Sequence, residues 1–210
     1  REPVRAAMCP LPRLVTVVRP AGPGGAGGAG GGGAGGASGR GGPGPSRLAT
    51  ILFSGTSWQA AIEAQQMLAE SWGVAAECWS VTSYKALRDD ALEVERWNRL
   101  HPGSAERHAF VTRALGSAPG PIVAVSDFLK AVPDQISRFV SSSFAPLGTD
   151  GFGRSDSRAA LRRHFEVDAA HVVVATLAAL AKTGAAKEHE VAEAIARYGI
   201  DPEAIDPFAA

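Results

Sequence analysis

The sequence is poor in cysteine, has no excess of either charge and contains no obvious membrane-spanning run. Cysteine occurs only at Cys9 and Cys78 among 210 residues, which is too few for a disulfide framework. Basic and acidic side chains number 21 each, so no overall basic field indicates a nucleic acid or an anionic membrane as a partner. We identify no run near the roughly 18 apolar residues that span a bilayer, and no secretory signal. The expected location is therefore a reducing cytoplasm.

The sequence also lacks the motifs of a self-contained active site. The turn at residues 54–57 has one glycine, where a dinucleotide site needs Gly-x-Gly-x-x-Gly. His189-Glu190 is not followed by a histidine at zincin spacing, and Cys78 has no cysteine or histidine at metal-ligand spacing. No serine occupies a Gly-x-Ser-x-Gly elbow. These absences predict that this chain carries no catalytic residue, no metal site and no cofactor site of its own.

Residues 1–47 differ in composition from the rest of the chain. Residues 21–45 hold 15 of the 25 glycines, diluted mainly by alanine, proline and arginine. Such a segment has little to bury and loses much backbone entropy on ordering, so we predict a disordered, flexible tract. Residues 14–18 could form only an isolated strand. The dominant residue types have GC-rich codons, so two origins stay open, a reading-frame error or a genuine linker.

Residues 48–210 alternate between short apolar runs and amphipathic stretches. The apolar runs predict strands at 49–53, 74–81, 121–126 and 144–147. The amphipathic or alanine-rich stretches predict helices at 58–72, 84–101, 105–115, 132–140, 157–164, 168–184 and 187–198. The strand at 121–126 is apolar on both faces, as is typical of a parallel sheet covered by helices on both sides. We therefore predict one α/β domain with extra C-terminal helices.

Several motifs in this domain are long enough to identify a resemblance. They are Val81-Thr82-Ser83-Tyr84, Glu95-Arg96-Trp97-Asn98, Leu100-His101-Pro102, the stretch Leu-Gly-Thr-Asp-Gly-Phe-Gly-Arg-Ser-Asp-Ser-Arg at 147–158, Leu161-Arg162, and His-Phe-Glu-Val-Asp-Ala at 164–169. This order resembles the end of the homodimeric bacterial pyruvate dehydrogenase first component, and its actinobacterial branch in particular. The resemblance covers about residues 49–210, whereas residues 1–47 do not match what the family has there.

The resemblance implies a fold, a cofactor and partners. The fold is a three-layer, transketolase C-terminal-domain-like sheet with helices on both faces. Family members are homodimers that use thiamine diphosphate and Mg²⁺ to decarboxylate pyruvate, and they pass the acetyl group to the lipoyl arm of an acetyltransferase. Their catalytic and cofactor-binding residues lie in two other domains, so none is carried over to this chain. On its own, this chain is expected to be inactive.

One loop is the candidate site for docking or for shaping the substrate channel. The candidate residues are Asp150, Gly151, Gly153, Arg154, Ser155 and Asp156. The glycines permit unusual backbone angles or close approach of another backbone. If the next helix begins early, with Ser155 or Asp156 as its N-cap, Arg154, Arg158 and Arg162 form one basic stripe. The alternative is a plain connection with a solvated arginine face.

Two other functions for the whole chain stay open. One is a non-enzymatic α/β module that binds a partner or, in a regulatory role, a small anion at residues 148–154. The other is a transketolase-type enzyme with different substrates. The sequence of residues 148–168 disfavours it, because it resembles the pyruvate enzyme. A coding frame for the cofactor-binding domains immediately upstream would favour the pyruvate enzyme over both.

Overall fold

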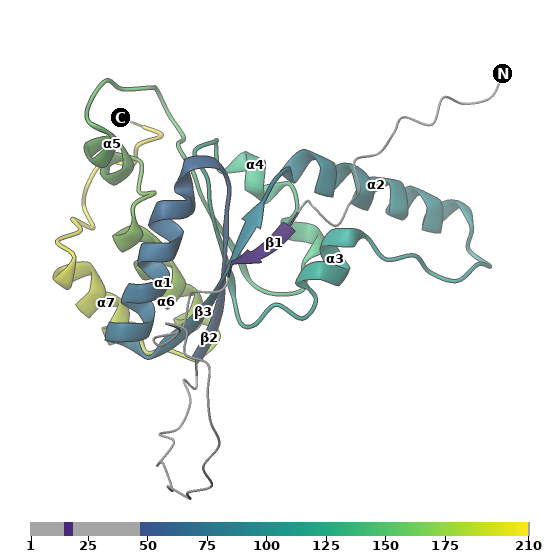
Figure 1. Ribbon diagram of the computed structural model, residues 1–210, viewed down its shortest axis with the longest axis horizontal. Helices are drawn as coiled ribbons and strands as arrows, with labels where there is room; N and C mark the ends of the chain where they lie inside the picture. The colour runs from purple at the N-terminus through teal and green to yellow at the C-terminus, as the bar shows by residue number, and fades with distance from the viewer. Residues whose placement is uncertain (1–14, 19–46, 210) are drawn as a thin grey trace, which may run out of the picture.

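The computed structural model describes residues 15–18 and 47–209 (Figure 1). The predicted disordered tract at residues 21–45 lies outside the described residues. The strands are β1 Val15–Val18, β2 Arg47–Phe53, β3 Val74–Val81, β4 Ile122–Val125 and β5 Phe144–Leu147. The α-helices are α1 Trp58–Trp72, α2 Tyr84–Leu100, α3 Phe110–Leu115, α4 Ala131–Asp134, α5 Arg158–His164, α6 Ala169–Lys182 and α7 Glu188–Arg197.

These strands form one sheet in the order β1-β3-β2-β4-β5. The pairs β2–β3, β2–β4 and β4–β5 are parallel, and β1 is antiparallel to β3. Helices α1 and α6 cover one face of the sheet, while α2 and α3 lie on the other (Figure 1). The predicted α/β fold with helices on both faces is therefore confirmed.

Strand β1 departs from the sequence prediction. The sequence predicts an isolated strand at residues 14–18, outside the fold, but Val15 pairs with Val81 and Val18 with Cys78. The free edge of a strand presents unpaired backbone N–H and C=O groups, and a run of β-branched residues suits that position. The sheet therefore begins before residue 48, although the division of the chain into 1–47 and 48–210 is otherwise still a prediction.

Two apolar cores lie on the two faces of the sheet. Because side chains alternate along a strand, Ile51 of β2 enters the core under α1 and α6, and Leu52 enters the core under α2 and α3. All four residues of β4 are buried, which confirms the prediction of a strand apolar on both faces. Each core is thus anchored by the two central strands.

Helix α6 supplies much of the first core. The Asp168 carboxylate accepts a hydrogen bond from the backbone N–H of His171 and caps the helix. Val172, Val173 and Leu177 are fully buried, so the prediction of a helix across this valine run is confirmed. Helix α7 follows and is tied to β2 by the Arg47–Glu190 ion pair of 2.7 Å.

The α5–α6 region corrects the expectation about membrane-length stretches. Residues Arg158–Lys182 are long and apolar enough to cross a membrane by length and composition alone. However, the backbone breaks between α5 and α6 at Glu166, whose φ is 57°, and half of the most apolar window is buried inside the domain. These properties are those of a core helix.

Two predicted helices are shorter than expected. The helix predicted at 105–115 begins only at Phe110, because the Asn98 side chain bonds both the backbone N–H and C=O of Arg107 and holds them outside a helix. The helix predicted at 132–140 splits into α4 and a 3₁₀ turn at Ser137–Phe139. There the Ser137 hydroxyl donates to the Asp134 carbonyl, the acceptor that the next helical turn would use.

Candidate functional site

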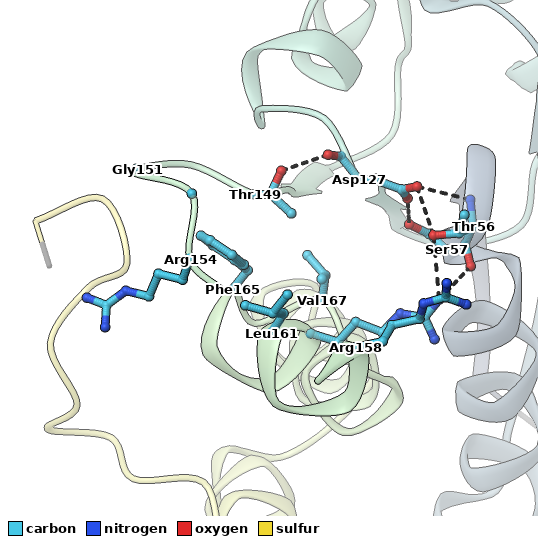
Figure 2. A pocket seen from close by; sticks show the side chains of 12 residues that line it. Thr56, Ser57, Asp127, Thr149, Gly151, Arg154, Arg158, Leu161, Phe165 and Val167 are labelled. Carbon is cyan, nitrogen blue, oxygen red and sulfur yellow. Dashed lines mark hydrogen bonds between the residues drawn. The ribbon is translucent and has the colours of Figure 1, made fainter. Parts of the chain in front are cut away.

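A pocket opens where the parallel strands β2, β4 and β5 end (Figure 2). The chain runs from β2 to β3 on one side and returns to β4 on the other side of β2. In open α/β sheets, ligands bind at such a switch of strand order, outside the carboxyl ends of the strands. The cavity volume is about 300 Å³. It is lined by Thr56, Ser57, Asp127, Thr149, Gly151, Gly153, Arg154, Arg158, Leu161, Arg162, Phe165 and Val167.

Asp127 follows β4, and its carboxylate lies against the turn that leads into α1, inside this pocket. Its carboxylate accepts hydrogen bonds from the Thr56 N–H at 3.1 Å, the Thr56 hydroxyl at 2.8 Å and the Ser57 hydroxyl at 2.5 Å. Burial alone would raise the pKa of Asp127, but these hydrogen bonds and the charge of Arg162 together lower it. The carboxylate thus takes the donors that a nucleotide phosphate would need, which agrees with the missing glycine motif.

The predicted N-cap of α5 is wrong by one or two residues. Ser157 caps the helix, because its hydroxyl accepts a hydrogen bond from the Ala160 N–H. Asp156 instead accepts from the Ser157 N–H at 2.6 Å. Helix α5 therefore begins at Arg158 and does not include Arg154.

The three arginines consequently do not form a single helical stripe. Arg162 donates hydrogen bonds to the Thr56 carbonyl and the Gln59 side chain, both at 3.1 Å. Arg158 extends toward the same turn, whereas Arg154 points to the opposite side of the pocket (Figure 2). Within the described residues, neither Arg154 nor Arg158 has a hydrogen-bond or ion-pair partner. The pocket therefore has an unpaired cation on two sides.

The floor of the pocket is apolar. Leu161, Phe165 and Val167 line it, and the last two are almost completely buried. They belong to the core under α1 and α6 or pack against it. The pocket thus combines a fixed apolar floor with arginine guanidinium groups and hydroxyls at its rim.

The candidate loop is only partly gathered at this pocket. Gly151, Gly153 and Arg154 line it, whereas Ser155 and Asp156 do not. Asp150 has a structural role, since it accepts the Lys130 N–H at 3.0 Å and pairs with the Lys130 ammonium at 3.8 Å. The loop is therefore anchored at Asp150 and exposed beyond it.

Gly151 is a position in this loop where a side chain would meet both a strained backbone angle and a close contact. Its φ is 93°, and a Cβ atom there would lie 2.1 Å from the Pro207 carbonyl oxygen. We expect Gly151→Val to destabilise the domain by about 1 to 3 kcal/mol, because the exposed C-terminal segment can move aside but the backbone angle stays strained. Urea unfolding should show Gly153→Val, with open space around its Cβ position, to be nearly neutral. Equal losses for the two variants would contradict this assignment.

Large exposed apolar side chains lie close in the chain to the pocket-lining residues, and they were not predicted from the sequence. Trp58, Phe128, Leu129, Phe152 and Phe208 are each at least half exposed. Trp58, Phe128 and Phe152 directly follow pocket-lining residues in the chain, Leu129 comes next to Phe128, and the Phe208 Cα lies 3.2 Å from the Cβ position of Gly151. We call these five residues the apolar rim. Exposed apolar side chains gathered near one site are candidates for an interaction surface.

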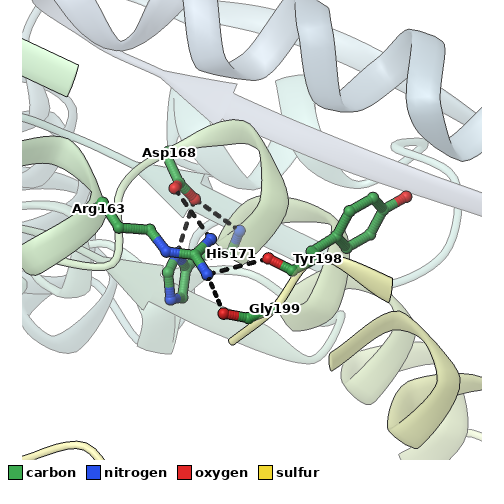
Figure 3. A network of polar contacts seen from close by, with 5 residues as sticks. All are labelled: Arg163, Asp168, His171, Tyr198 and Gly199. Atoms are coloured by element: carbon green, nitrogen blue, oxygen red, sulfur yellow. Dashed lines mark hydrogen bonds and ion pairs between the residues drawn. The ribbon is translucent and has the colours of Figure 1, made fainter. Parts of the chain in front are cut away.

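A polar network joins α5, α6 and α7 (Figure 3). Arg163 donates to the Tyr198 carbonyl at 3.0 Å and the Gly199 carbonyl at 2.6 Å, and pairs with Asp168 at 3.4 Å. The His171 ring nitrogen Nδ1 lies 2.6 Å from the same carboxylate. Arg163 thus links the start of α6 to the end of α7.

A match to a family model identifies the class of protein to which this fold belongs. The model of the transketolase-like TK C-terminal domain matches residues 43–168, and the chain belongs to this family. The structure extends beyond that match, because α6 and α7 complete the first core.

Curated relatives narrow the class of protein to which this chain is similar. A pyruvate dehydrogenase E1 component of Pseudomonas aeruginosa is 49% identical over 159 residues, covering 75% of this chain and 18% of its own length. Those of Mycobacterium tuberculosis and Escherichia coli K12 are 46% and 43% identical, covering 76% and 75% of this chain but only 17% and 18% of their own lengths. The resemblance to the pyruvate enzyme is confirmed, but these identities do not single out the actinobacterial branch. Among solved structures, a split-gene transketolase described as an inactive beta4 tetramer is 21% identical, with a TM-score of 0.43, over 64% of this chain and 39% of that chain.

Proposed function

We propose that this chain is the C-terminal domain of a thiamine-diphosphate-dependent pyruvate dehydrogenase E1 component. The supporting observation is the 43–49% identity to relatives of that name over about three quarters of the chain. On this proposal, the complete enzyme is a cytoplasmic homodimer that decarboxylates pyruvate and hands the acetyl group to a lipoyl-bearing acetyltransferase.

The described residues of this chain do not fit the cofactor or its metal. Among the described residues, no three His, Cys, Asp or Glu side chains converge on a metal site. Asp127 is already engaged by Thr56 and Ser57, and burial raises the pKa of Cys78 to about 12, so its thiol stays protonated. On this proposal, the other domains of the complete enzyme hold thiamine diphosphate and Mg²⁺. We expect calorimetry of the 210-residue chain with both to show no micromolar binding.

The role that we propose for this domain is docking. The apolar rim and Arg154 present an aromatic and cationic surface at one end of the sheet, the composition enriched at the centres of protein interfaces. The relatives are more than five times longer than the matched region, so their remaining domains are the natural occupant. The candidate loop would then dock on those domains and shape the entrance to the active site.

A domain exchange tests this function. Residues 47–210 replace the matching region of the Pseudomonas aeruginosa relative, and acetyl transfer from pyruvate is compared with that of the parent and of a version lacking the region. We expect the exchange to retain turnover within about tenfold, since half of the positions are shared, and the deletion to abolish it. A folded, dimeric exchange protein as inactive as the deletion would contradict the proposal.

Phe152→Ala in the exchange protein tests the docking surface. Phe152 is 84% exposed in this chain, so its truncation should leave the melting temperature of the isolated chain unchanged. In the dimeric enzyme we expect turnover or dimer affinity to fall about fivefold or more, with a similar loss for Arg154→Ala. Arg113→Ala, an exposed change on α3 across the sheet, is the matched control. Unchanged turnover and dimer affinity in both loop variants would leave only a solvated connection.

A further inference from the structure

We infer that the pocket at the ends of β2, β4 and β5 binds a small organic anion with an apolar body. This site is independent of thiamine diphosphate and is formed by residues of this chain alone. Gly151, Gly153 and Arg154 line it and also belong to the loop proposed to dock. The chemical class of its ligand follows from the charge of the pocket lining, its apolar floor and the size of the cavity.

Charge comes first. Arg158 and Arg162 lie four residues apart on α5, so they share one face of the helix, and both line the pocket. Two cations at this spacing repel each other. Asp127 is the carboxylate of the pocket lining. It is occupied by Thr56 and Ser57, and the charge of Arg162 helps to lower its pKa. Arg158 is left exposed and without a partner among the described side chains, so an anion that enters the pocket relieves the repulsion.

The floor and the size then define the body of the ligand. Phe165, Leu161 and Val167 provide an apolar surface beside the guanidinium groups. The Thr149 hydroxyl at the rim already donates to the Asp127 carbonyl at 2.7 Å, so the arginines are left to bind the anion. A volume of about 300 Å³ holds a molecule of ten to twenty heavy atoms. A flat ring or a short chain ending in a phosphate or carboxylate fits these three features, and guanidinium groups bind either end group in a bidentate manner. A bare inorganic ion would leave the apolar floor exposed to water.

Phenyl phosphate is the probe that combines both parts. Titrated into the 210-residue chain at low salt, it is expected to bind with a dissociation constant of about 1 mM or tighter, as suits eleven heavy atoms. Amide shifts in a heteronuclear NMR spectrum should map to Thr56, Thr149 and Leu161. Inorganic phosphate and phenol, which each carry only half of the recognition, should bind at least tenfold more weakly.

Arg158→Ala is the decisive variant, because this side chain has no partner in the fold and its loss should not unfold the domain. We expect phenyl phosphate to bind at least tenfold more weakly to it, and Arg113→Ala to bind as the unmodified chain does. Raising the salt concentration should lower the affinity of the unmodified chain for phenyl phosphate toward that of the variant. Equal affinity for phenyl phosphate and inorganic phosphate, shifts that map elsewhere, or an unaffected Arg158→Ala variant would each overturn the inference. These results do not depend on turnover, so they are separate from the domain-exchange test.

Discussion

Gly120→Ala is expected to destabilise the domain by about 3 to 5 kcal/mol, a large part of the stability of a typical domain. Gly120 has a φ of 65°, and a Cβ atom there would lie 1.8 Å from the carbonyl oxygen of Leu48. Leu48 belongs to β2, the strand that pairs on both sides, so it cannot retreat without breaking the sheet. The segment before β4 would have to move instead. Thr50 would then lose its bonds to Pro119 and Pro121, both of 2.9 Å.

Gly184→Ala is the matched control for this prediction. Gly184 also has a positive φ, 75°, but open space surrounds its Cβ position. It should therefore show only the backbone cost, roughly 1 to 2 kcal/mol, and the difference between the two variants measures the clash. Urea unfolding followed by circular dichroism gives both values. If Gly120→Ala were no less stable than Gly184→Ala, the close approach to Leu48 would not be a real constraint.

Asp168→Ala is expected to cost about 2 to 4 kcal/mol. The carboxylate caps α6 through the His171 N–H and contacts both the His171 ring and Arg163. A lost N-cap costs about 1 kcal/mol, and lost hydrogen bonds to charged groups cost more. Asp168→Asn keeps a cap but removes the charge, so its loss in urea unfolding should be smaller. No loss in Asp168→Asn would show that the charged contacts contribute nothing, and a loss equal to that of Asp168→Ala would show that the cap contributes nothing.

The same side chain predicts a pH dependence. Burial alone would raise the pKa of Asp168, but the hydrogen bonds from His171 and the charges of His171 and Arg163 outweigh burial and lower it. A carboxyl with a lowered folded pKa stabilises the fold above its unfolded pKa of about 3.9, and this contribution disappears as pH falls through the folded value. The stability gap between the unmodified chain and Asp168→Asn should therefore be constant above about pH 5 and shrink below about pH 4. A gap that does not shrink at all as the pH falls below about 4 would contradict this mechanism.

Local patterns determined most of the fold that could be predicted. The strand at 74–81 and the helix ending before Gly73 have the predicted bounds, because alternation and a left-handed cap are properties of neighbouring residues. The position of β1 could not be predicted in this way. Its pairing depends on the free edge of β3, more than sixty residues later in the chain.

The candidate site was predicted less well for the same physical reason. The loop glycines were identified from their spacing, and Gly151 does have a positive φ. The role of Asp127 and the apolar rim were not visible, because they arise where separate loops meet at one end of the sheet. The arginine stripe was wrong because one hydroxyl, that of Ser157, decides where α5 begins.

The place of α6 in the sequence has a consequence for synthesis on the ribosome. All five strands precede this helix in the chain, yet Val172, Val173 and Leu177 complete the core over Ile51. A nascent chain whose sheet has emerged, but whose α6 is still in the exit tunnel, exposes one apolar face to the cell. Exposed apolar surface of this kind makes partly folded chains prone to aggregate. A ribosome that pauses during the synthesis of α6 would therefore prolong the interval in which the apolar face of the nascent chain is exposed and most needs a chaperone.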